Sequence, residues 1–153
     1  RTILIPVEES VHSVATIRWA RSNFLRPSDK VVLVNVRPYQ QVYLADLGAD
    51  LLIAVNDLEA AARQKSHDLI RTFARYLTTP IENEPNLVVP ADVEGFAIRG
   101  DARLDITRKA AEVHATAVVM GCRGLGAFKR AMLGSVSAYV SSHSPAPVVI
   151  VRP

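Results

Sequence analysis

The chain has 153 residues, of which 49% are hydrophobic and 22% charged, and its formal net charge is +3. These values are typical of one folded domain, so they exclude a disordered chain and predict a single domain over residues 1–153. The charge is too small to predict a nucleic-acid partner, and the apolar runs are too short to cross a membrane. The single cysteine, Cys122, excludes an internal disulfide and fits a reducing compartment, so we expect a cytoplasmic protein.

Apolar runs and helical patterns alternate along the chain. Short apolar runs predict strands at residues 2–7, 30–36, 92–99, 116–120 and 148–151. Between them, apolar residues recur at spacings of three and four, which predicts helices at residues 10–25, 57–77, 102–114 and 135–142. This alternation favours the α/β class, with a parallel sheet covered by helices on both faces. Residues 51–55 could form a strand, a helix or a packed loop.

Individual residues of the first two helices also have expected places. Ser10 is expected to be the N-cap of the first helix, because a serine hydroxyl can accept a hydrogen bond from a free helical N–H group. Val14 and Ile17 are expected on the buried face of that helix. In the second helix, the buried face is expected to begin at Leu58.

The stretch from residue 121 to residue 135 is the most informative part of the sequence. It follows a predicted strand, is rich in glycine, and contains Arg123, Lys129 and Arg130 without an acidic residue. Glycines let a backbone approach a ligand closely, and Ser135 is expected to cap a helix whose free N–H groups attract phosphate. The alternative is a solvated loop with glycine hinges. The stretch matches neither the Walker P-loop nor the GxGxxG fingerprint.

Other kinds of catalytic site are not predicted. The four histidines lack the spacing of metal ligands, and no nucleophile elbow or general base is evident, so no catalytic residue is assigned. Cys122 is either a small space-filling residue or a redox-sensitive thiol beside a basic loop.

The glycines form a longer pattern, Gly121-x2-Gly124-x9-Gly134-Ser135. With this pattern, and with the segments ILIPVEES, VVLVNVRP, GDARLDI, AVVMGCRGLG and SPAPVVIVRP, nearly the whole chain resembles the universal stress protein family. The pattern is that of its ATP-binding members. The resemblance implies a single-domain, three-layer α/β sandwich of the adenine nucleotide alpha hydrolase-like class, whose five mainly parallel strands have the order 3-2-1-4-5.

Matching the family's motif position by position also implies a nucleotide site. Its residues lie at the ends of three strands and at the start of the last helix: Pro6, Val7, Glu8, Val36, Met120, Gly121, Arg123, Gly124, Gly134, Ser135, Val136 and Ser137. The resemblance implies that Pro6, Val7 and Glu8 lie near ribose and adenine and that the Val36 backbone recognises adenine. It also implies that the last four residues hold phosphates and that ribose and phosphates are flanked by Met120, Gly121, Arg123 and Gly124. Glu8 stands where the family usually has aspartate, so its carboxylate is displaced by roughly 1.5 Å and the ribose contact could be lost or made through water. Glu8 could instead be a solvated residue before the first helix.

The function implied is binding of ATP or AMP, which Mg²⁺ or Mn²⁺ could accompany, in stress response or regulation, with at most slow ATP hydrolysis. The resemblance also implies a homodimer joined through Val148–Val151, which would cover an apolar edge strand. Two alternatives stay open. One is an ATP-dependent enzyme on the same fold, and the other is a dimerisation or partner-binding module without nucleotide.

Overall fold

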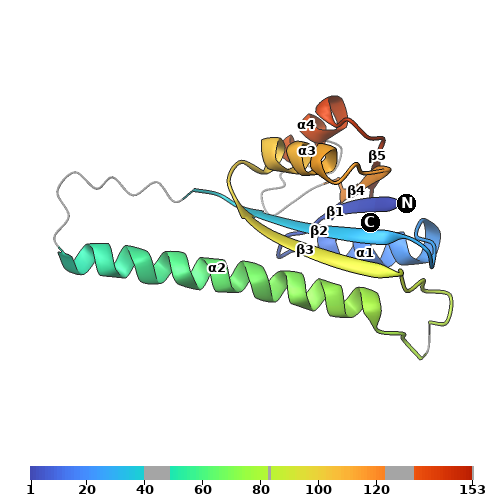
Figure 1. The fold of residues 1–153 in the computed structure, drawn as a ribbon, viewed down its shortest axis with the longest axis horizontal. Coiled ribbons are helices and arrows are strands. Elements are labelled where there is room, and N and C mark those ends of the chain that lie inside the picture. The colour runs from blue at the N-terminus through green and yellow to red at the C-terminus, as the bar shows by residue number, and fades with distance from the viewer. Residues whose placement is uncertain (40–48, 83, 123–132, 153) are drawn as a thin grey trace.

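A single parallel sheet with the strand order β3-β2-β1-β4-β5 forms the centre of the computed structural model (Figure 1). Its strands are β1 (Thr2–Pro6), β2 (Lys30–Arg37), β3 (Asp92–Arg99), β4 (Ala117–Gly121) and β5 (Val148–Val151). The helices are α1 (Val11–Asn23), α2 (Ala49–Thr78), α3 (Ala102–Glu112) and α4 (Ser135–His143). The structure describes residues 1–39, 49–82, 84–122 and 133–152. The predicted α/β class and strand order are confirmed.

Helices cover both faces of the sheet, so the protein has three layers and two apolar cores (Figure 1). Between the sheet and helices α1 and α2 lies the first core, made of Ile3, Ile5, Val7, Ile17, Ala20, Leu25, Val31, Leu33, Ile70, Phe73, Leu77, Ala117, Val119 and Val151. On the side of α3 and α4 lies the second core, made of Leu4, Val32, Val34, Ile106, Ala110, Val118, Met120, Val140 and Ala146. Because successive side chains of a strand point to opposite faces, burial on both faces requires the continuous apolar runs seen in the sequence.

Helix α1 confirms one prediction and corrects another. Ser10 is its N-cap, and the Ser10 hydroxyl accepts a hydrogen bond from the Ser13 N–H group at 3.3 Å. Ile17 is buried as predicted, but Val14 is 49% exposed. The buried stripe includes Ser13 and Thr16, whose hydroxyl groups are hydrogen-bonded, so polar residues take the inward positions and Val14 lies outside them.

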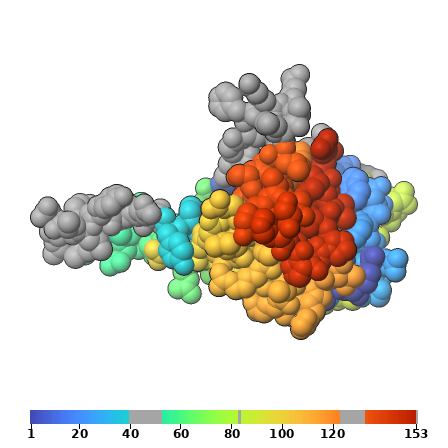
Figure 2. Space-filling model, turned by 90° about the horizontal axis from the view of Figure 1, so that it is seen from above, coloured from blue at the N-terminus to red at the C-terminus, as the bar shows by residue number. Residues whose placement is uncertain are grey.

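Helix α2 is longer than predicted, because residues 51–55 are helical and the helix begins at Ala49. The prediction that Leu58 starts its buried face is wrong, since Leu58 is 60% exposed. The amino-terminal part of α2 runs past the end of the sheet, which Figures 1 and 2 show from two directions. Contact with the first core therefore begins further along, and Ser66 and Ile70 are the first buried residues of the helix whose side chains the structure describes.

Candidate functional site

The carboxyl ends of β2, β1 and β4 meet at one edge of the sheet. These strands are parallel neighbours, and the direction in which the chain adds strands reverses at β1. In open α/β sheets, ligands bind beyond the strand ends at such a reversal. The predicted site residues at this edge are Pro6, Val7, Glu8, Val36, Met120 and Gly121.

The end of β1 is held by main-chain and side-chain hydrogen bonds. The Val7 N–H group donates to the Val34 carbonyl at 2.8 Å, and the Val7 side chain belongs to the first core. Glu8 is half-buried; its N–H group donates to the Ser13 hydroxyl at 2.9 Å, and its carboxylate accepts from the Ser10 hydroxyl at 3.1 Å. The Glu8 carboxylate thus lies beside the positive end of α1, where a helix favours an anionic group.

A buried polar bridge that was not predicted fixes this strand end to α2. The Asn35 side chain donates to the Val7 carbonyl at 2.8 Å and accepts from the Ser66 hydroxyl at 2.5 Å. Both partners of the bridge are buried, so each polar group is satisfied inside the protein. One signal could have revealed it, because Asn35 is the polar residue inside the apolar run KVVLVNV.

At the end of β4, the side chains pack into the protein, so the groups left for a ligand to contact are those of the backbone. Met120 lies in the second core, and Gly121 pairs with Val151 of β5. The Cys122 N–H group donates to the Val151 carbonyl at 2.9 Å, and the Cys122 thiol is buried. Val36 of β2 also packs against the second core. At these positions a ligand would therefore meet mainly backbone groups.

The segment after β4 and the start of α4 are joined directly. The Cys122 carbonyl accepts from the Gly134 N–H group at 2.8 Å and from the Ser137 hydroxyl at 3.0 Å. Ser137 is 2% exposed, and its hydroxyl also lies 3.0 Å from the Gly134 carbonyl. The Ser137 hydroxyl therefore links the end of β4, at Cys122, to the start of α4, at Gly134. Arg123 and Gly124 lie outside the described residues, as do Lys129 and Arg130.

The start of α4 corrects the prediction that Ser135 caps this helix. The helix begins at Ser135, and its N-cap is Gly134, which makes no side-chain cap hydrogen bond. Ser135 is exposed, whereas Val136 packs against the second core. A glycine N-cap leaves the first N–H groups of a helix without a side-chain acceptor, so they can bind an anion.

The other described N-caps differ from that of α4. Ser10 caps α1, and Asp101 caps α3 by accepting a hydrogen bond from the Arg103 N–H group at 2.9 Å. The Arg103 guanidinium also hydrogen-bonds to the Asp101 carboxylate, which lowers the pKa of Asp101 to about 2. A carboxylate thus already occupies the anion position of α3. Of the three helices whose N-caps are described, α4 has the one without a capping side chain.

Within the part of the chain that the structure describes, no group of three or more histidine, cysteine, aspartate or glutamate side chains is placed to hold a metal ion. Among the described helices, none combines the length and apolar character needed to cross a lipid bilayer.

Known proteins share both the sequence and the fold of this chain. A model of the universal stress protein family matches residues 1–152, so the chain belongs to that family. Universal stress protein PHOS32 of Arabidopsis thaliana is 32% identical over 163 residues, which cover 99% of this chain and 64% of that protein. The chain therefore spans less than two thirds of the length of this curated relative.

Two solved structures share the fold and contain nucleotides. One is a universal stress protein family protein of Arabidopsis thaliana with AMP bound; it is 18% identical, with a TM-score of 0.64 over 98% of this chain and 90% of that one. The other is a universal stress protein in complex with cAMP; it is 20% identical, with a TM-score of 0.58 over 99% of this chain and 97% of that one. Some structural neighbours of this chain thus bind adenine nucleotides.

Proposed function

We propose that this member of the universal stress protein family binds an adenine nucleotide, ATP or AMP, in stress response or regulation rather than in fast catalysis. The observation that carries the proposal is the start of α4, where Gly134 supplies no capping side chain and the Gly121-x2-Gly124-x9-Gly134-Ser135 pattern ends. Free N–H groups and the positive end of a helix dipole stabilise phosphate without needing a basic side chain. The AMP and cAMP complexes of the structural neighbours support the same ligand class.

In this proposal, different strand ends contact different parts of the nucleotide. The main chain of Val36 faces adenine, and Pro6, Val7 and Glu8 lie on the adenine and ribose side. Ribose and phosphates lie between the end of β4 (Met120, Gly121, Arg123, Gly124) and the start of α4 (Gly134, Ser135, Val136, Ser137). The buried Ser137 hydroxyl contributes by holding Cys122 and Gly134 together, while its N–H group belongs to the phosphate-binding turn.

A metal ion fits this site only as a companion of the phosphates. Mg²⁺ is commonly bound through one or two carboxylates and substrate phosphate oxygens, and Glu8 is the one carboxylate that the family motif places at the site. Mg²⁺ or Mn²⁺ would neutralise phosphate charge there. We also propose a cytoplasmic location, because a single buried cysteine fits a reducing compartment, and a homodimer through Val148–Val151.

Calorimetry with AMP and ATP tests the nucleotide site. Gly134 has φ −63° and ψ 157°, angles that any residue can adopt, so valine can replace it without backbone strain. Gly134→Val should nevertheless abolish binding, because its branched side chain would occupy the space next to the N–H groups that face the phosphate. Circular dichroism should show that the variant is folded. Unchanged affinity in a folded Gly134→Val variant would remove the proposed phosphate position.

A further inference from the structure

Apart from the proposed nucleotide site, a hollow lies beside α2, near the ends of β2 and β3. Its volume is about 710 Å³, within the usual range of small-molecule sites of roughly 300–1,000 Å³. The lining residues are Arg37, Asn56, Glu59, Ala60, Arg63, Gln64 and Arg99. None of them belongs to the proposed nucleotide site, so this hollow, called the arginine groove below, is independent of that proposal.

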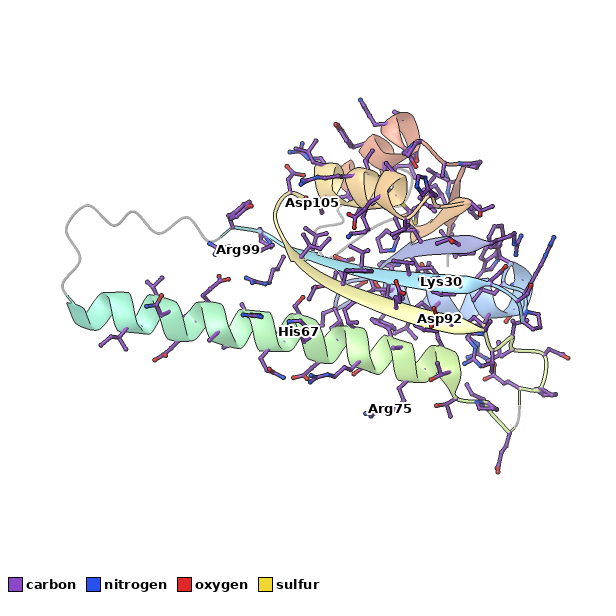
Figure 3. All side chains as sticks on the ribbon, viewed as in Figure 1. Lys30, His67, Arg75, Asp92, Arg99 and Asp105 are labelled. Carbon is purple, nitrogen blue, oxygen red and sulfur yellow. The ribbon has the colours of Figure 1, made fainter. Side chains whose placement is uncertain are left out.

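The strand register places two cations of the arginine groove side by side. Arg37 of β2 pairs with Arg99 of β3 as direct neighbours in the sheet. Arg99 lies where these strands end, over the amino-terminal part of α2 (Figure 3). Like charges directly opposite each other on neighbouring strands destabilise a sheet. The neighbouring Arg37 and Arg99 side chains therefore need an anion beside them to offset their repulsion.

Glu59 supplies part of that compensation. Its carboxylate forms an ion pair with the Arg37 guanidinium, and the same oxygen lies 3.5 Å from the Arg99 guanidinium. Arg63 is one helical turn from Glu59, and within the described residues no ion pair is recorded for it. Three guanidinium groups and one carboxylate give the lining of the groove a formal charge of +2.

One donor atom of the Arg37 guanidinium lacks an acceptor in the part of the chain that the structure describes. The Nε atom of Arg37 is buried and has no hydrogen-bond partner among the described residues. A buried donor without an acceptor destabilises a protein, so a small shift of the Arg37 side chain that brings Nε to an oxyanion in the groove would be favourable. Guanidinium groups bind phosphate through paired, charge-assisted hydrogen bonds.

We infer that the arginine groove binds a small phosphate monoester. A phosphate monoester carries a charge of about −1.5 to −2 at pH 7, which matches the excess charge of the lining. Its phosphate lies among the three guanidinium groups. The Asn56 amide and the Gln64 side-chain oxygen hydrogen-bond to the hydroxyl groups of the rest of the molecule, while the Gln64 N–H group donates to Asp68. Glu59 holds Arg37 and Arg99 in place and competes with the phosphate for them.

Nuclear magnetic resonance of the ¹⁵N-labelled chain tests this inference, with glucose 6-phosphate as the probe and glucose as the neutral control. Glucose 6-phosphate should cause saturable shifts of the backbone amide signals of Arg37, Glu59, Arg63 and Arg99, and glucose should cause none. If no saturable shifts occur up to about 10 mM glucose 6-phosphate, any dissociation constant is above that concentration and the inference is overturned. Shifts confined to residues 134–137 would also overturn it, because they would place the phosphate at α4.

Matched variants separate the groove from general charge effects. The double variant Arg63→Gln/Arg99→Gln should weaken binding by about tenfold or more, since it removes two charge-assisted contacts. Arg75→Gln removes a charge from the same helix far from the groove (Figure 3) and should leave the affinity unchanged. Glu59→Gln should tighten binding, because it removes the competing carboxylate. Equal losses in the double variant and in Arg75→Gln, or weaker binding in Glu59→Gln, would contradict the inference.

Discussion

At the scale of single residues, a buried ionic contact holds the amino ends of β1 and β2, opposite the strand ends of the proposed ligand sites. The Asp29 carboxylate is buried and accepts hydrogen bonds from the Arg1 guanidinium at 2.7 and 3.0 Å and from the Arg26 N–H group at 2.8 Å. The hydrogen bond from Arg1 lowers the pKa of Asp29. A carboxyl group whose pKa is lowered in the folded state stabilises that state above its ordinary pKa.

Asp29→Asn should therefore destabilise the protein in a pH-dependent way. At pH 7 we expect a loss of about 1.5–3 kcal/mol, the usual contribution of hydrogen bonds to a charged group. The loss should shrink as the pH falls below about 4, because wild-type Asp29 is then protonated as the pH approaches its lowered pKa. Urea denaturation of both proteins at pH 7 and pH 3 measures the difference. Equal differences at the two pH values would show that the charge of Asp29 is not responsible.

At the scale of secondary-structure elements, β5 is the last strand of the described sheet and leaves one edge open. The Pro147 carbonyl accepts a hydrogen bond from Val118 of β4, and the Val151 carbonyl accepts one from Cys122, which follows β4. Because backbone groups alternate in direction along a strand, the N–H and C=O groups of Val148 and Ile150 point away from β4. These groups are available to pair with β5 of a second copy.

Ile150→Pro should prevent the proposed dimer, because proline removes an N–H group from the open edge. Ile150→Ala is the matched control, since it also removes side-chain packing but keeps the N–H group. Sedimentation velocity at micromolar concentration should give dimers for wild type and Ile150→Ala, and monomers for Ile150→Pro. A monomeric wild type, or a dimeric Ile150→Pro, would contradict the proposed interface.

Sequence patterns predict which segments form strands and helices more completely than they predict which side chains of those elements are buried. The strands were predicted because burial on both faces leaves a continuous apolar run, and the order of the strands came from the resemblance to a family. Periodicity could not show that α2 extends past the sheet, so Leu58 was wrongly placed in the core. Val14 was misplaced because hydrogen-bonded Ser13 took the inward position.

The candidate site was predictable in part, for a related reason. Residues at strand ends follow from the positions of the strands, so Glu8 and Gly121 could be named from sequence. Asn35 binds Val7, which is 28 residues away in the chain, and Ser66, which is 31 residues away. Local spacing carries no information about such distant contacts. The arginine groove was missed because it depends on the register that pairs Arg37 with Arg99.

At the scale of the whole molecule, we expect the proposed site to bind phosphate rather than transfer it. Fast phosphoryl transfer needs a held metal ion, a positioned nucleophile and charge stabilisation at the γ-phosphate. The described residues offer no cluster of metal ligands, and Glu8 is the one carboxylate that the motif places nearby. In the proposed site, the groups at the start of α4 that face the phosphate are backbone N–H groups, which stabilise charge without moving a proton.

ATP turnover should therefore be far below the typical enzyme median of about 10 per second. A steady-state phosphate-release assay with saturating ATP and Mg²⁺ measures it directly. A rate above about 1 per second that is lost in both Glu8→Ala and Ser135→Ala would move this protein to the class of ATP-dependent enzymes.

The proposed function requires that nucleotide phosphate lies against the uncapped start of α4. Gly134→Asp and Gly134→Asn both supply a side-chain oxygen that can cap this helix, so both should keep the stability of the free protein at least at that of wild type. They differ in charge, because aspartate places a carboxylate where the phosphate would bind. Calorimetric titration with ATP should show weakened but measurable binding to Gly134→Asn, because its amide N–H group, unlike a valine side chain, can donate to the phosphate. Gly134→Asp should show no binding. Equal ATP affinity of the two variants would contradict the claim.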